Sequence, residues 1–314
     1  MVDGINAKIP IKEYQALHLI SLFDLQYAHT QRSSETKFKY IGEFKNLILE
    51  IKFDMHEYML IVRGSLHKYF HNTNNSDFVW SELDQVITDI FSNFKMNMAV
   101  ISHKDQVNKI KQLSFPLSKA EVGVIIEIGI DDLHSFLNNN LIQHKKEPFR
   151  CEDGLVFKCE HKNYYLKLYP KGKNLLRVEI VLLSSELRKY KIFTLSDLTK
   201  DKIRPIAERL KKEISEIVFA DGINIHTAQN LTKAEEIKLL RFTSEWRNKQ
   251  FLMDKERSSI RERRNAFQRM WRLSKASKQI FESKSCGYKR MIVELVDQKV
   301  DELLTMPMHE TLST

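Results

Sequence analysis

The chain has 314 residues, 42% of them hydrophobic, which is enough to fill a packed core and argues against an intrinsically disordered protein. No apolar run has the length of a membrane span and no secretion signal is recognisable, so we expect neither a membrane partner nor export. The formal net charge is +9, and residues 254–290 carry 12 Lys and Arg against 4 Asp and Glu, which favours an anionic polymer as partner.

Apolar periodicity and capping residues place the expected elements of the first 220 residues. In chain order they are a packed helix over residues 9–23, a strand hairpin at 45–53 and 55–63, a helix capped by Ser76 or Asp77, a strand at 121–129, a short helix capped by Asp131 or Asp132, three antiparallel strands at 155–160, 164–169 and 175–183, and a helix over 202–219.

The character of the chain changes after residue 221, because nothing further has the alternation of a strand. Three helices are expected there, over residues 231–247, 258–281 and 288–304. We therefore predict an α+β domain with an antiparallel sheet and helices packed on one face over residues 1–222, followed by an all-helical basic region over residues 223–314. The second region is a candidate helix-turn-helix-like DNA-binding region.

Side chains alternate across a strand, so the two strands at 164–169 and 175–183 each have an apolar face and a polar face. If the strands pair as a hairpin with one shared buried face, the parity of their register is fixed. The polar side chains must then lie together on the opposite face: Lys167, Tyr169, Arg177 and Glu179, with Lys171 and Lys173 at the turn.

The strand expected at 121–129 has two carboxylates on its polar face, Glu121 and Glu127. They are six positions apart along the strand, so they lie about 20 Å from each other and are too distant to act as a pair. Either of them can join a site that is completed by other strands.

This combination of side chains matches the chemistry of DNA strand transfer. The oxygen of Tyr169 can attack a phosphorus and hold the cut end as a covalent ester. A divalent metal held by carboxylates polarises the phosphoryl oxygen, and Lys167 and Arg177 stabilise the charge of the transition state. The alternative is an ordinary solvent-exposed hairpin with amphipathic tyrosines and cross-strand Lys–Glu pairs.

The segment over residues 258–281 is expected to be a helix with one apolar stripe, which includes Trp271, and a basic remainder. Such a helix can dock on phosphates or enter a major groove, with salt-dependent affinity. A solvated face that binds nothing is the alternative. The candidate DNA-binding residues of the whole chain are Lys171, Lys173, Arg257, Arg261, Arg264, Arg269, Arg272 and Lys275.

Three segments resemble a known family when they are taken in order. They are LIVRGSLHKYFHNTNNSDFVWSELDQVI from residue 60, AEVGVIIEIGID from residue 120, and NYYLKLYPKGKNLLRVEIVLLSSELRKYKIFTLSDLTK from residue 163. The chain resembles the filamentous-phage gene II/X-type replication proteins and their relatives in bacterial mobile elements, including many from Bacteroidota. It is also similar to rolling-circle plasmid initiators, which share the Tyr-x-Lys and Arg-x-Glu pattern.

The resemblance implies a replication-initiator-like fold and a protein that cuts one DNA strand at an origin and stays attached through a tyrosine. By position it assigns Tyr169 as the nucleophile, Glu179 as a ligand of a divalent metal (Mg²⁺ or Mn²⁺), and Glu121 or Glu127 as a further acidic ligand. Tyr164 and Tyr165 are alternative nucleophiles, although Tyr164 lies on the apolar face.

Two features depart from related initiators. None of the 11 histidines forms a His-apolar-His pair; the nearest spacing is His67 and His71, a weak two-ligand metal candidate with a capping or surface role as the alternative. Pro170 follows Tyr169 where relatives often have Asp or Asn, and it restricts the tyrosine to extended backbone. The three cysteines show no disulfide or metal spacing and indicate a reducing, cytoplasmic setting.

The sequence therefore favours a DNA replication initiator of a phage, plasmid or transposon that nicks and rejoins one strand as an endonuclease. The alternative is a non-catalytic, sequence-specific DNA-binding protein that acts as a repressor, copy-control factor or adaptor. RNA binding by the same sheet face and an acidic partner protein are further alternatives. The expected partners are origin DNA, a second copy of the chain and host replication proteins.

Overall fold

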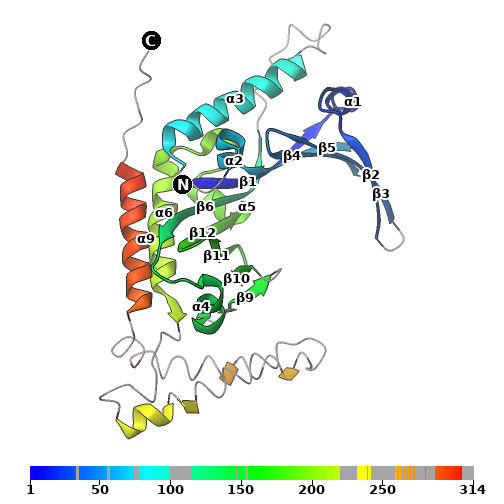
Figure 1. Cartoon of the computed structure of the whole chain (residues 1–314). Coiled ribbons are helices and arrows are strands. Elements are labelled where there is room, and N and C mark those ends of the chain that lie inside the picture. Colours follow the sequence, from blue (N-terminus) through cyan, green and yellow to red (C-terminus); the bar gives the residue numbers. More distant parts are fainter. Residues whose placement is uncertain are drawn as a thin grey trace.

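The fold is α+β and is built on a large antiparallel sheet, as the sequence predicts (Figure 1). The computed structural model describes residues 1–32, 35–54, 57–73, 78–99, 115–145, 147–152, 155–219, 232–238 and 287–305, together with residues 240–241, 259, 261–262, 265, 268–269, 272 and 280.

The first hundred residues supply five strands and three helices to the described part of the chain. In order they are β1 (Val2–Ile11), α1 (Glu13–Leu22), β2 (Gln26–Arg32), β3 (Glu35–Phe44), β4 (Leu47–Asp54), β5 (Glu57–Ser65), α2 (Leu66–His71) and α3 (Trp80–Ala99).

The later elements surround the predicted hairpin. They are β6 (Leu117–Glu127), α4 (Leu133–Asn140), β7 (Leu141–His144), β8 (Glu147–Pro148), β9 (Arg150–Glu152), β10 (Val156–Glu160), β11 (Tyr164–Gly172), β12 (Leu175–Leu183), α5 (Ser184–Leu187), the 3-10 turns η1 (Arg188–Tyr190) and η2 (Leu195–Asp197), α6 (Lys200–Ser215), β13 (Ile217–Phe219) and α9 (Tyr288–Thr305).

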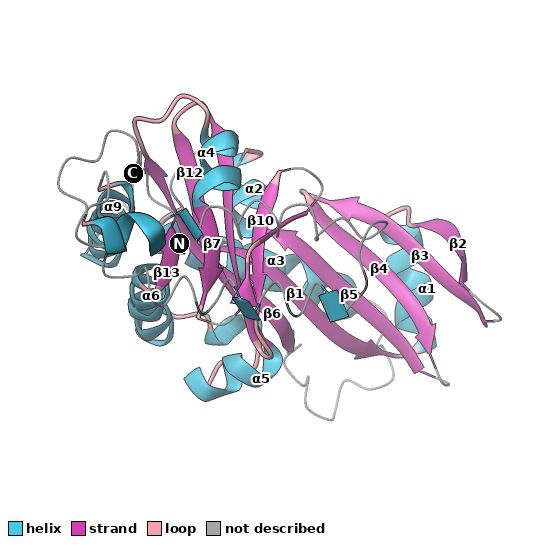
Figure 2. Cartoon of the chain, turned by 90° about the horizontal axis from the view of Figure 1, so that it is seen from below, coloured by secondary structure: helices cyan, strands magenta, loops and turns pink. Residues whose placement is uncertain are grey.

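Ten of these strands form one sheet in the order β2-β3-β4-β5-β1-β6-β12-β11-β10-β9. Every neighbouring pair in it is antiparallel, and Figure 2 shows the strands side by side across the molecule. A second, three-stranded sheet has the order β13-β7-β8. Strand β1 lies between β5 and β6. It therefore connects strands β2–β5 to the half of the sheet that contains the hairpin β11–β12.

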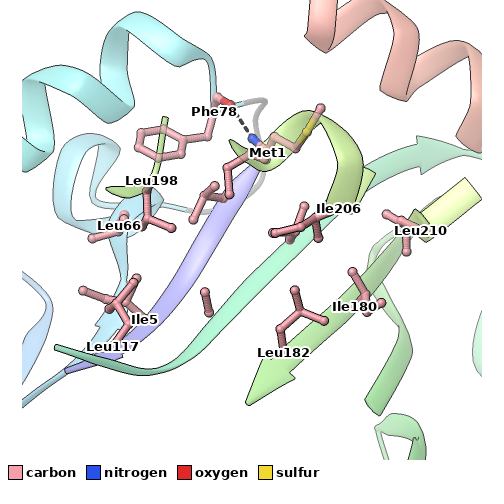
Figure 3. Close-up of a cluster of buried hydrophobic side chains, with 14 of the residues drawn as sticks. Met1, Ile5, Leu66, Phe78, Leu117, Ile180, Leu182, Leu198, Ile206 and Leu210 are labelled. Carbon is pink, nitrogen blue, oxygen red and sulfur yellow. Dashed lines mark hydrogen bonds between the residues drawn. The ribbon is translucent and has the colours of Figure 1, made fainter. Parts of the chain in front are cut away.

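Helix α6 packs on the central strands through a single apolar stripe. Its buried apolar residues recur at helical spacing, and they are Ile203, Ile206, Ala207, Leu210 and Ile214. Figure 3 shows Ile206 and Leu210 in one cluster with Ile180 and Leu182 of β12. The even-numbered residues of β12 therefore face the helices, which leaves its odd-numbered residues for the opposite face.

The last helix, α9, confirms the helix expected at 288–304 and shares this core. Its buried residues are Ile292, Val296, Val300, Leu303 and Leu304. It lies beside α6 (Figure 1), and the indole nitrogen of Trp80 donates a hydrogen bond to the carbonyl of Leu303 at 2.9 Å. The predicted boundary near residue 222 lies outside the described residues. None of the helices in the described ranges is both long and apolar enough to cross a membrane.

Most strands appear where alternation predicts them, including the hairpin β4–β5, strand β6 and the three strands β10–β12. The short helix α4 is capped by Asp132, whose carboxylate accepts from the amide of Ser135 at 2.9 Å. Helix α3 begins at Trp80 rather than at Ser76 or Asp77, which lie outside the described residues.

Two boundaries differ from the sequence-based expectation. Residues 9–11 belong to β1 and not to a helix over 9–23, because Ile9 and Ile11 continue the buried alternation of Ile5 and Ala7. The helix predicted to end at 219 ends at Ser215, and the β-branched Ile217 and Val218 form β13 with β7 instead.

Candidate active site on the central sheet

The hairpin β11–β12 has the register that places the polar side chains together. Lys167 lies opposite Glu179, and Tyr169 lies opposite Arg177. The other face of these strands is apolar and buried. The sequence-based prediction that these four side chains share one face agrees with this register.

Glu179 is the centre of this face, and its side chain has no exposed surface. One carboxylate oxygen accepts hydrogen bonds from the Arg177 Nε at 2.9 Å and from the Tyr169 hydroxyl at 3.2 Å. The other oxygen accepts from the Lys167 ammonium at 3.2 Å. Because charged donors compensate the buried carboxylate, removal of one of them would leave an uncompensated charge in the core.

Strand β6 contributes Glu121, which resolves the choice that the sequence left open between two carboxylates. The Lys167 Nζ lies 3.0 Å from an oxygen of Glu121, and the Lys119 Nζ lies 2.6 Å from the same oxygen. Glu127 lies opposite Leu175 at the far end of the strand and is exposed. The structure therefore brings Glu121 into the site and leaves Glu127 outside it.

Two glycines make room for these carboxylates. A Cβ atom at Gly123 would lie 2.4 Å from the carbonyl oxygen of Val178 and 2.7 Å from the Cγ of Glu179. A Cβ atom at Gly4 would lie 2.6 Å from the carboxyl carbon of Glu121. A glycine inside a strand often marks such a close approach, so Gly123 was a signal available in the sequence.

Strand β1 adds Asp3, which the sequence analysis did not assign to the site. Its carboxylate accepts from the Arg177 guanidinium at 3.1 Å and from the hydroxyl of Ser65. Burial acts to raise the pKa of Asp3, but Arg177 and then the Ser65 hydrogen bond outweigh it and lower that pKa. The detectable signal was a lone acid in the apolar alternation of residues 2–11.

The protonation of the site follows from burial and its charges. Burial, followed by the charge of Glu179, raises the pKa of Tyr169, so the resting side chain is a neutral phenol. Burial acts to lower the pKa of Lys167, but Glu179 and Glu121 outweigh it and raise that pKa. Burial, followed by Arg177, lowers the pKa of Lys171, whose ammonium lies 5.3 Å from the centre of the Tyr169 ring.

The alternative tyrosines have different surroundings. Tyr164 lies on the apolar face, as its parity predicts, and its hydroxyl donates to Glu213 at 3.0 Å, away from Glu179. Tyr165 lies on the same face as Tyr169, and its hydroxyl accepts from Lys119 at 3.4 Å. Tyr169 is thus the tyrosine that is hydrogen-bonded to the central carboxylate.

The carboxylates of the site do not fit a bridging divalent metal in this arrangement. The Lys167 Nζ lies within 3.2 Å of both Glu179 and Glu121, where an ion shared by them would have to lie. Among the described residues, the groups of ligand atoms that converge lie elsewhere and do not include these carboxylates. The Mg²⁺ or Mn²⁺ expected from the resemblance therefore requires displacement of Lys167.

The other predicted site residues have varied placements. Lys173 is exposed at the turn of the hairpin, and Arg261, Arg269 and Arg272 are exposed and helical, whereas Arg257, Arg264 and Lys275 lie outside the described residues. His67 and His71 lie on one face of α2 with ring centres 4.9 Å apart, and the His71 Nε2 lies 3.0 Å from Glu82.

Comparisons of the chain with family models, with curated proteins and with solved structures give no match. The function of the site is therefore inferred from its own geometry. That geometry joins four strands: β11 supplies the phenol and a lysine, β12 the central carboxylate and an arginine, and β6 and β1 one further carboxylate each.

Proposed function

We propose that this chain is a DNA-nicking and strand-joining protein, a replication initiator of a mobile element, with Tyr169 as the nucleophile. The observation that carries the proposal is the hydrogen bond from the Tyr169 hydroxyl to the buried Glu179 at 3.2 Å. A tyrosine with an adjacent base, on a face lined by cations, is the arrangement that attack on a phosphodiester needs.

The proposed reaction transfers the DNA strand to the tyrosine. The phenol oxygen of Tyr169 forms a bond to a backbone phosphorus, and the bond from that phosphorus to the leaving deoxyribose oxygen breaks. The phenol proton passes to Glu179. Because the raised pKa keeps the resting phenol neutral, this proton acceptor is required for attack.

Two lysines have separate roles in the proposed reaction. Lys171 lies beside the phenol, and its lowered pKa makes its ammonium a better acid for the leaving oxygen. Lys167 holds Glu179 and Glu121 in position. The exposed Arg261, Arg269 and Arg272 supply contacts to the DNA backbone.

A second candidate is a non-catalytic DNA-binding protein. The observation that favours it is the saturation of Glu179, which is fully buried and already accepts from Arg177, Tyr169 and Lys167. Both oxygens of this carboxylate are already occupied by donors, and the same network can serve to join strands of the sheet. The candidate roles are then those of a repressor, copy-control factor or adaptor.

The deciding experiment incubates the protein with supercoiled DNA from its own element and measures nicked circles and DNA held covalently by denatured protein. We expect both products with the wild type and neither with Tyr169→Phe, which lacks the attacking oxygen. Tyr165→Phe is the matched control, because Tyr165 lies four residues away on the same strand and face.

The possible outcomes separate the two candidates. Loss of the covalent product in Tyr165→Phe but not in Tyr169→Phe would contradict the assignment of the nucleophile. Binding to a demonstrated origin with no nick would favour the non-catalytic candidate. Parallel reactions with Mg²⁺, with Mn²⁺ and with a chelator establish whether nicking requires a divalent ion.

A further inference from the structure

A second cluster of chemically active side chains lies at the edge of the large sheet, away from Tyr169. Its members are His144 at the end of β7, Cys159 in β10, and His161 in the turn that leads to β11. His144 and Cys159 are fully buried, and His161 is half-buried. One ligand atom of each residue lies within 4.8 Å of the ligand atoms of the other two.

The spacing of these three atoms is close to that of a tetrahedral metal site. Zinc bonds of about 2.0–2.1 Å to nitrogen and about 2.3 Å to sulfur place ligand atoms about 3.3 Å (N···N) and about 3.5 Å (S···N) apart. The Cys159 Sγ lies 3.6 Å from the His161 Nε2, and the two histidine nitrogens lie 2.8 Å apart. A zinc ion therefore requires the two rings to separate by about half an ångström.

The second ring nitrogen of His144 lies beside a carboxylate, an arrangement that is usual for metal-binding histidines. Its Nε2 lies 2.8 Å from a carboxylate oxygen of the buried Glu213. A hydrogen on Nε2 that faces this carboxylate leaves the Nδ1 lone pair directed at the cluster. The ring of His161 is also fixed, because it stacks on Tyr164 with centres 4.5 Å apart and planes 13° apart.

The carboxylate side of His144 is less suited to a cation. Glu213 and Glu216 also converge on His144, but the Lys145 ammonium lies 2.7 Å from Glu213 and 3.4 Å from Glu216. Arg209 pairs with the other oxygen of Glu213 at 3.1 Å. These acids already hold two cations, so the thiol side is the better place for a metal.

We propose that His144, Cys159 and His161 bind a zinc ion, with Glu213 as the carboxylate that orients His144. Two imidazole nitrogens and one thiolate form a donor set that suits Zn²⁺, and a solvent molecule completes the tetrahedron. On binding, the thiol proton, which is now directed at the carbonyl of Glu147 at 3.3 Å, leaves to solvent. The ion connects the small sheet to strand β10 of the large sheet.

The test measures zinc binding by the full chain, and its result does not depend on whether the protein nicks DNA. Metal analysis of the purified protein is expected to give about one zinc per chain. After removal of zinc, Co²⁺ is expected to give the near-ultraviolet band of a cobalt–thiolate bond. This band should remain in Cys151→Ser, a matched control at the exposed cysteine of β9, and disappear in Cys159→Ser.

A complementary variant tests the role of Cys159 even if Cys159→Ser does not fold. The double substitution Cys151→Ser with Cys286→Ser leaves Cys159 as the sole cysteine, and we expect it to keep the cobalt band. Glu213→Gln retains all three ligands and should weaken zinc binding about 10- to 100-fold, because it removes the partner of His144. Absence of both zinc and the cobalt band in the wild type, or a band that depends on another cysteine, would overturn the proposal.

Discussion

The backbone of β6 passes close to Glu179 at Gly123, where a Cβ atom would lie 2.4 Å from a carbonyl oxygen of β12. A carbonyl in the centre of a sheet has little freedom to move, because it is held by the hydrogen bonds of the ladder. The absence of a side chain at this position thus allows the buried carboxylate to lie between the two strands.

Gly123→Ala is therefore expected to lower the free energy of unfolding by about 1–3 kcal/mol through overpacking. Urea denaturation followed by circular dichroism measures this change. Gly129→Ala is the matched control, because a Cβ atom there meets nothing within 4 Å, and we expect a change within about 0.5 kcal/mol. Equal stability of the two variants would contradict the close approach at Gly123.

Asp197 gives a pH dependence that can be isolated by one substitution. Burial acts to raise its pKa, but Lys202 and the amides of Phe193 and Thr194 outweigh this and lower the pKa to about 2. Since the folded pKa lies below the unfolded value of about 3.9, this group stabilises the fold fully above about pH 4 and loses that contribution as the pH falls toward about 2.

Asp197→Asn removes this contribution, so its destabilisation should be largest near neutral pH and shrink on acidification. Urea midpoints of the wild type and the variant, compared from about pH 6 to about pH 3, measure the difference. Asp201→Asn, in the first turn of α6, is the control. A difference between wild type and Asp197→Asn that is constant with pH would show that the carboxylate charge is not the cause.

At the scale of elements, helix α9 is joined to the N-terminal half by the hydrogen bond from Trp80 to Leu303 at 2.9 Å. Trp80→Phe keeps most of the apolar contact but leaves that carbonyl without its donor, which should cost about 1–3 kcal/mol. Hydrogen exchange should become faster in α9 before it does in α6. Glu294→Gln on the exposed side of α9 is the control; equal exchange in the two variants would contradict this role of Trp80.

The sequence predicted the elements whose faces are chemically distinct. Strands β6, β11 and β12 alternate cleanly, so parity alone indicated that Tyr169, Lys167, Arg177 and Glu179 share a face. Strand β1 was missed because Ile9 and Ile11 were grouped with the apolar residues of the helix that follows them, so residues 9–23 resembled one helix. The alternation of apolar residues, followed from Val2, would have predicted this strand.

The contacts between distant elements were not predictable from the sequence. Local periodicity gives the face of a side chain but not the order of strands, so it did not place Asp3 beside Arg177 or distinguish Glu121 from Glu127. Cysteine spacing was uninformative for the same reason. Cys159 and His161 are two residues apart, but His144 reaches them only through the small sheet formed by β13, β7 and β8.

At the scale of the whole molecule, the distribution of positive charge predicts how the proposed DNA binding responds to salt. Arg261, Arg269 and Arg272 are exposed within the segment of residues 254–290, which carries most of the net positive charge and is called the basic segment below. Their replacement by Gln should weaken DNA binding and reduce the slope of log affinity against log salt by about 0.9 for each lost phosphate contact.

The control replaces the same number of positive charges outside that segment. Lys233, Lys238 and Arg241 are exposed as well, and their replacement by Gln should change the slope less. Binding measured by fluorescence anisotropy over a range of salt concentrations compares the two triple variants. Equal slopes for both would show that net charge, and not the basic segment, determines affinity.

The central position of β1 has a consequence for biosynthesis. This strand leaves the ribosome long before its neighbours, because it pairs with residues 58–65 on one side and with 117–122 on the other. At ordinary rates of translation the second neighbour follows after on the order of ten seconds. During that interval an apolar strand with an unpaired edge is exposed in the nascent chain, so a chaperone that shields residues 2–11 should raise the yield of native protein.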